Sequence, residues 1–196
     1  MLVRSESGWP SGIAVPNTKH GVVSPSEHGA VDGMDNRPMR AAGFNVEAGT
    51  LLLAVVERRD EGPATPVPVT SPKLTPADLP EAQSLRDLAK RVKQELEAAR
   101  VDAVGLVQTR AFRNLQYNQV YARVTAICAV MFAAAELNVA YETLTTETIG
   151  TAISCLPKSL DTFDFAVLGF AQRPTFWTTG LAEAYAAAYT LVGGTT

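Results

Sequence analysis

The apolar residues of this chain form two kinds of pattern, and their order along the sequence predicts an α/β fold. The run Thr50–Val56 is continuous and apolar, and it follows a segment from Ala41 that ends in a glycine turn, so we expect two paired strands here. A second β-branched run, Val101–Val107, is typical of a buried parallel strand. Val139–Thr143 has a similar character and predicts a further strand.

Helical periods occupy the segments between and after these strands. Following Pro80, apolar residues recur every three or four positions, with charged residues on the other faces. An Ala-rich segment, Asn118–Asn138, is apolar on most sides, which predicts a largely buried helix. Thr146–Cys155 and Thr178–Leu191 predict two more helices. This order of strands and helices indicates an α/β protein with a mixed sheet flanked by helices.

Proline positions divide the chain into two parts. Four of the twelve prolines lie within residues 1–40, and six lie between Pro63 and Pro80. Residues 1–40 also hold five of the fourteen glycines and show no sustained period, which predicts a disordered or loosely attached N-terminal arm. We expect the folded domain to span 41–196, with a proline-rich loop at 62–80 that contains at most an edge strand, over Pro66–Thr70.

Composition narrows the function classes without identifying one. The 46% hydrophobic content excludes disorder along the whole chain, and 17 basic against 20 acidic residues give a net charge of −3, so no global positive field attracts nucleic acid or an anionic membrane. The apolar run Val124–Ala135 is shorter than a membrane span, so we expect no membrane insertion. Cys128 and Cys155 lack Cys-x-x-Cys spacing and are expected to be small buried hydrophobic residues. No secretory pattern stands at the start, so we expect a cytoplasmic protein.

Three short motifs lie where the predicted strands and helices follow one another along the chain. One is a hairpin with an acid before its glycine, one is a strand end that leads into the Ala-rich helix and the next strand, and one is a final helix with an acid between small residues. In chain order they are Val46–Thr50 with Ala54–Glu57, then Val104–Gln108 with Asn118–Arg123 and Leu137–Glu142, and then Leu181–Ala188.

From about Gly43 to Val192, these motifs resemble the RuvC-type Holliday junction resolvases, a family within the RNase H-like superfamily. The resemblance implies an RNase H-like fold and a site in which carboxylates from the first strand, the central strand and the final helix hold two divalent ions, Mg²⁺ or Mn²⁺. Two such ions activate a water and stabilise the leaving oxygen during phosphodiester cleavage. The resemblance assigns the catalytic positions to Glu47, Gln108 and Glu183, with Glu47 and Glu183 as the metal ligands.

The residues at these positions weaken the implied site. Glu47 and Glu183 stand where the family usually has Asp, Gln108 stands where it usually has Glu, and Gly180 replaces a second acid. Gln108 keeps an acceptor oxygen but removes a negative charge between the ions. Our leading hypothesis is a protein that binds branched or single-stranded DNA with cleavage weakened or lost. The alternatives are an active Mg²⁺- or Mn²⁺-dependent endonuclease and a structural subunit that uses the fold for protein contacts.

Simpler interpretations remain open for the same residues. Glu47 also fits a strand-end acid at a turn, and Asn45, on the same face of the strand, fits either a neighbouring ligand or a group that solvates the turn. Gln108 fits a polar residue that ends a strand, although α/β sheets tend to place sites there. Glu183 fits a solvated helix face. Nothing in the sequence places three further acids near the site, namely Glu136, Asp161 and Asp164.

Between Asp102 and Glu136 the charged residues are all arginines. Arginine forks bind phosphates, and the tyrosine and amide side chains among them add stacking and hydrogen bonds. An ordinary solvated surface explains these arginines equally well. The predicted nucleic-acid contacts are Arg110, Arg113, Asn118, Tyr121 and Arg123.

Two further segments concern partners and packing. Because RuvC-type proteins are commonly homodimers, the helix Tyr121–Leu137 is a candidate dimer face, with another protein partner as the alternative. An aromatic group before the last helix is expected in the core or at an interface. Its members are Phe163, Phe165, Phe170, Phe176 and Trp177.

Overall fold

The central sheet begins with the expected hairpin. The computed structural model describes residues 37–60, 62–108 and 116–193, so most of the predicted arm lies outside the described residues. β1 (Met39–Glu47) and β2 (Thr50–Arg58) pair antiparallel along their full length. Ala48 and Gly49 join them with positive φ angles of 48° and 82°, which suit a tight two-residue hairpin turn. The two strands and the glycine turn agree with the prediction, and β1 starts before the expected boundary at residue 41.

Four more strands in the described part of the chain complete a mixed sheet with the order β3-β2-β1-β5-β6. β5 (Ala103–Val107) and β6 (Ala140–Leu144) extend it parallel to β1. β3 (Thr65–Val67) is the predicted edge strand and pairs with β2, as does the two-residue β4 (Lys73–Leu74). β4 was not predicted, because two residues are too few to leave a periodic pattern.

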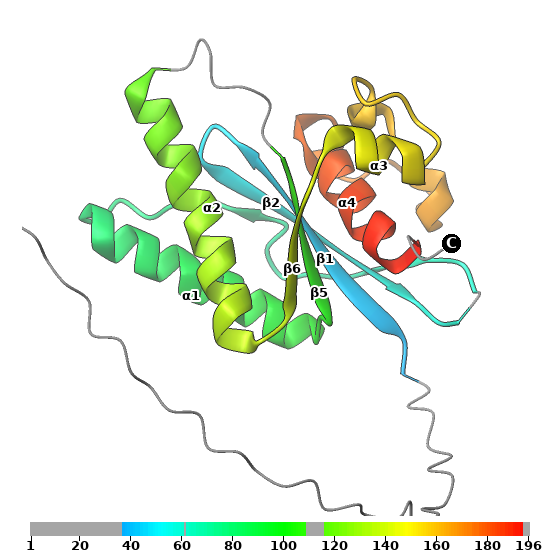
Figure 1. The fold of residues 1–196 in the computed structure, drawn as a ribbon, viewed down its shortest axis with the longest axis horizontal. Coiled ribbons are helices and arrows are strands. Elements are labelled where there is room, and N and C mark those ends of the chain that lie inside the picture. The colour runs from blue at the N-terminus through cyan, green and yellow to red at the C-terminus, as the bar shows by residue number, and fades with distance from the viewer. Residues whose placement is uncertain (1–36, 61, 109–115, 194–196) are drawn as a thin grey trace, which may run out of the picture. The chain divides into compact units, whose positions relative to one another are not determined.

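Helices cover both faces of this sheet (Figure 1). α1 (Glu81–Ala99) and α2 (Tyr117–Leu137) pack on one face, and α4 (Leu181–Gly193) packs on the other with α3 (Thr146–Ala152) beside it. α4 begins at Leu181, whereas the sequence predicted a start at Thr178. The chain between α3 and α4 contains three short 3₁₀ turns, at Leu160–Thr162, Phe165–Leu168 and Trp177–Thr179.

Alternation along β1 sends successive side chains to opposite helical layers. Phe44 and Val46 are buried against the layer of α1 and α2. Gly43 lies on the opposite side, where a Cβ would come within 1.9 Å of the Ala184 carbonyl oxygen. The backbone of α4 therefore packs directly on β1 at Gly43, and the next residue of β1 on that side is Asn45.

The prediction that α2 is largely buried is wrong. Its buried residues are small and lie on one side, and 28% of its most apolar 18-residue window is buried. An Ala-rich helix that is apolar all round does not indicate which side faces the protein. By length and composition alone, α2 would suffice to cross a membrane, but one side of it packs on α1. The large apolar residues that it exposes are Tyr117, Tyr121, Val124, Met131 and Phe132.

The aromatic residues before α4 pack around the buried Trp177, which confirms the core interpretation for most of them. The indole N–H of Trp177 donates to the Phe163 carbonyl oxygen at 3.0 Å. Burial raises the pKa of Tyr185 to about 12, so its hydroxyl stays neutral and the ring serves packing. Phe176 is the exception, because it lies outside this cluster and is 37% exposed. The rings in contact with Trp177 are Phe163, Phe165, Phe170 and Tyr185.

Candidate functional site

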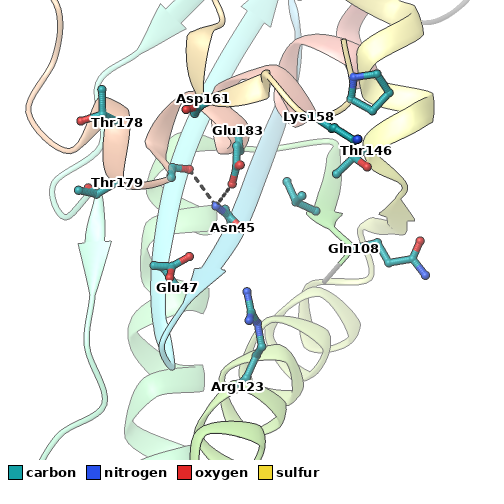
Figure 2. A pocket seen from close by; sticks show the side chains of 13 residues that line it. Asn45, Glu47, Gln108, Arg123, Thr146, Lys158, Asp161, Thr178, Thr179 and Glu183 are labelled. Carbon is teal, nitrogen blue, oxygen red and sulfur yellow. Dashed lines mark hydrogen bonds between the residues drawn. The ribbon is translucent and has the colours of Figure 1, made fainter. Parts of the chain in front are cut away.

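A pocket of about 610 Å³ opens at the carboxyl ends of β1 and β5, next to the start of α4 (Figure 2). Its walls also include α2, the start of α3 and the loop that follows α3. Open α/β sheets place binding sites at such carboxyl ends. The polar side chains that line the pocket are Asn45, Glu47, Gln108, Arg123, Thr146, Lys158, Asp161, Thr178, Thr179 and Glu183.

The buried centre of the pocket is a pair formed by Asn45 and Glu183. Asn45 is 4% exposed, and its Nδ2 donates to the Glu183 carboxylate and to the Gly180 carbonyl oxygen, the latter at 3.2 Å. Since both neighbours are acceptors, the nitrogen of the amide must face them. A Cβ on Gly180 would lie 2.5 Å from Asn45 Nδ2, so this position leaves no room for the second acid of the family.

The three residues that the resemblance assigns to catalysis all line the pocket, but the structure does not gather them into one cluster. Glu183 lies at the centre, and Glu47 follows Asn45 on the same side of β1 at the exposed rim. Gln108 is exposed and points away from the pocket in Figure 2. Val107 is buried on the α4 side of the sheet, so alternation turns the next side chain to the other side. The side chain of β5 that faces Glu183 is therefore apolar.

This donor set does not fit a pair of divalent ions. Such ions need several oxygen ligands, mostly carboxylates, around one point. Within residues 37–60, 62–108 and 116–193, no three His, Cys, Asp or Glu side chains lie close enough together to hold a metal ion. Asn45 also directs an N–H at Glu183, and a donor group cannot ligate a cation. The metal-ligand roles of Glu47 and Glu183 stay predictions that this geometry does not support.

The three acids that the sequence could not place relative to the site lie in different parts of the structure. Asp161 lines the pocket from the first 3₁₀ turn and is exposed. Asp164 caps the second turn, because its carboxylate accepts from the Ala166 backbone N–H at 2.9 Å. Glu136 forms an ion pair with Lys93 at 3.0 Å in the layer of α1 and α2. Asp161 alone of these three adds to the charge of the pocket.

Two cations reach the pocket from different elements. Arg123 of α2 donates from Nη2 to the Val46 carbonyl oxygen, while its buried Nε has no hydrogen-bond partner among the residues that the structure describes. A buried N–H without an acceptor is costly, and an anion such as a phosphate would satisfy it. Lys158 enters from the loop after α3 and was not singled out from the sequence. The available signal was that residues 136–196 hold just two basic residues, of which Lys158 is one.

The structure places some of the residues predicted to contact nucleic acid at the pocket and others away from it. Arg123 lines the pocket, whereas Asn118 is exposed at the start of α2 and lies outside the pocket wall. Tyr121 turns to α1, where its hydroxyl donates to the Glu81 carboxylate at 3.0 Å, and this bond raises the pKa of Tyr121. Arg110 and Arg113 lie outside the described residues.

Comparison with known proteins supports the fold. No protein-family model matches the chain, and no curated protein matches its sequence. The structure of Thermus thermophilus RuvC is similar with a TM-score of 0.63 and 22% identity, over 80% of this chain and 98% of that one. T. thermophilus RuvC in complex with a Holliday junction substrate has a TM-score of 0.64 and 23% identity, over 78% and 92% of the two chains. The yeast mitochondrial Holliday junction resolvase has a TM-score of 0.50 and 13% identity, over 79% and 78%.

These likenesses confirm the fold class that the sequence predicted. They extend over about four fifths of the chain. The chain therefore has the RuvC-like form of the RNase H-like fold.

Proposed function

We propose that this protein binds branched or single-stranded DNA at the pocket, with metal-dependent cleavage weakened or lost. The fold it shares with RuvC, including a RuvC structure bound to a Holliday junction, supports a role in nucleic-acid handling. The observation that carries the second part is the hydrogen bond from Asn45 to Glu183 at the pocket centre. An amide with a buried N–H occupies the place where a two-ion site needs a shared oxygen ligand.

Binding without a metal requires protein cations to meet the phosphates. Arg123 offers its unpaired Nε, and Lys158 adds a positive charge on another wall of the pocket. Glu47 and Asp161 lie on the same walls and oppose an anion. We therefore expect weak affinity, on the order of 1–100 µM at physiological salt, which is the range of sequence-independent DNA binding.

The test uses a labelled four-way junction and a labelled single strand, each incubated with the protein in EDTA or in Mn²⁺. We expect a gel shift in both buffers and intact DNA in both. Lys158→Ala should weaken the shift, because it removes a phosphate contact. Lys90→Ala is the matched control, since it removes the same charge from the exposed face of α1, which lies across the sheet from α4.

Other results would favour the alternatives. Cleavage in Mn²⁺ that disappears in Glu183→Gln would establish an active endonuclease and overturn the loss of cleavage. A protein that binds neither DNA but copurifies with a stable protein partner would be a structural subunit.

We also propose that the protein forms a homodimer through α2. The exposed side of this helix carries a row of residues at alternating spacings of four and three, the spacing of a helix-to-helix seam. A two-fold axis would bury the row against its copy. The row consists of Tyr117, Tyr121, Val124, Cys128 and Met131.

A further inference from the structure

Phe176 has an unusual position for a large aromatic residue. It is 37% exposed, and its backbone is left-handed, with a φ of 66°. Bulky side chains rarely adopt this region, and where they do, the surrounding structure must hold them there. The carbonyl of Phe176 accepts from the backbone N–H and the hydroxyl of Thr179, each at 3.0 Å, and from the Leu181 N–H at 3.2 Å. The turn that holds Phe176 thus also supplies the pocket wall.

One basic side chain lies against this ring, and a second lies close to it in the sequence. Lys73 reaches from β4, and its Nζ lies 5.2 Å from the ring centroid of Phe176. Arg173 is exposed three residues before Phe176. Residues 136–196 contain six acids and two bases, and the two bases are Arg173 and Lys158 of the pocket. The few cations of this acidic part of the chain therefore lie in the pocket and in the segment that precedes Phe176.

We propose that Phe176 and Lys73 form a stacking platform for one unpaired nucleobase of a strand whose backbone enters the pocket. An exposed aromatic ring beside basic side chains is the usual arrangement for binding single strands, because every base has a π-face and every nucleotide a phosphate. The proposal rests on the proposed DNA binding and adds a preference for strands with exposed bases. The left-handed turn presents the ring outward, away from the aromatic core around Trp177.

Two strands of equal length separate stacking from phosphate binding. One is a short oligo(dT), and the other is the same deoxyribose phosphate chain with every base removed. We expect the unmodified protein to bind oligo(dT) about five-fold or more tightly than the abasic strand, as a single stacked base predicts. Phe176→Leu should remove this preference and leave binding of the abasic strand unchanged, while Phe176→Tyr should keep it.

Three further variants complete the test, and Val167→Ala is the control among them. Phe176→Gly accepts a positive φ without steric cost, so it remains folded if Phe176→Leu does not, and it should also lose the preference. Val167→Ala shortens another exposed apolar side chain, outside the pocket, and should keep the preference. Lys73→Met should lower the slope of log affinity against log salt by about 0.7, the value for one phosphate contact to a single strand.

The outcomes distinguish this proposal from the one on which it rests. Equal preference for oligo(dT) in the unmodified protein, Phe176→Leu and Phe176→Gly would overturn the platform and leave DNA binding intact. Equal affinity of the unmodified protein for oligo(dT) and the abasic strand would also overturn the platform and leave DNA binding intact. If the unmodified protein binds neither strand, the proposed DNA binding fails and the platform fails with it.

Discussion

Asn45 occupies the position on β1 from which a carboxylate could share a cation with Glu183. Its amide instead donates to Glu183 and to the Gly180 carbonyl, so two acceptors are satisfied by one neutral group. The pair needs no metal to balance its charge, because it carries a single negative charge where a carboxylate pair would carry two. An amide in place of a carboxylate at this position therefore suits the metal-free pocket and offers no second carboxylate ligand beside Glu183.

The variant Asn45→Asp tests this account. It replaces a buried donor with an acceptor that faces two other acceptors, so we expect the free energy of unfolding at neutral pH in EDTA to fall by about 1–3 kcal/mol. Two carboxylates in contact raise the pKa of the pair, so the loss should be present above that pKa and should shrink as the pH falls through it. Thermal unfolding at acidic and neutral pH measures both effects.

A divalent cation should partly restore the stability of the Asn45→Asp variant. Mn²⁺ that binds the folded variant raises its unfolding temperature with concentration, and the unmodified protein should show a smaller rise. Gln108→Glu is the control, since its exposed side chain points away from the pocket and the change should cost less than about 0.5 kcal/mol. Equal stability of Asn45→Asp and the unmodified protein in EDTA would contradict the role of the Asn45 donor.

Among the elements that the structure describes, α2 carries more exposed large hydrophobic residues than any other. Its small residues face the protein and allow close packing on α1, while larger ones point outward. In a monomer such a surface is a liability for aggregation, whereas a second copy would cover it.

We expect Met131→Glu to give a monomer if the protein is a dimer through α2. The side chain is 47% exposed, so the change should leave the free energy of unfolding within about 0.5 kcal/mol, while a charge in a dimer seam is desolvated and costly. Size-exclusion chromatography with light scattering measures the mass. Val167→Glu, at a residue 50% exposed on another element, is the matched control and should keep the dimer. A monomeric unmodified protein would refute the dimer.

Local patterns predicted most elements, because the glycine turn at Ala48–Gly49, the helical period of α1 and the apolar run of β5 are each visible in consecutive residues. The site was harder to predict from the sequence than the elements, because Asn45 and Glu183 are separated by 138 positions in the chain. Their contact depends on the register of β1 beneath α4, which the close approach at Gly43 sets. A shift of one residue at a strand end likewise decides that Val107 rather than Gln108 faces the pocket.

At the scale of the whole molecule, a net charge of −3 repels DNA, so binding depends on a few cations in one region. Arg123 and Lys158 line the pocket, and Lys73 lies beside it at Phe176. Three phosphate contacts to a single strand predict a slope of log affinity against log salt of about −2. Arg123→Met should reduce the magnitude of this slope by about 0.7, and Lys90→Met should not change it.

Fluorescence anisotropy of a labelled single strand across a salt series measures this slope. A slope steeper than about −4 would mean that more phosphates are bound than the described cations can contact. Arg110→Ala with Arg113→Ala would then decide whether the predicted arginines supply the excess, because their loss should bring the slope back to about −2. A slope near zero would contradict phosphate binding at the pocket altogether, since a basic side chain cannot bind a phosphate without releasing counterions.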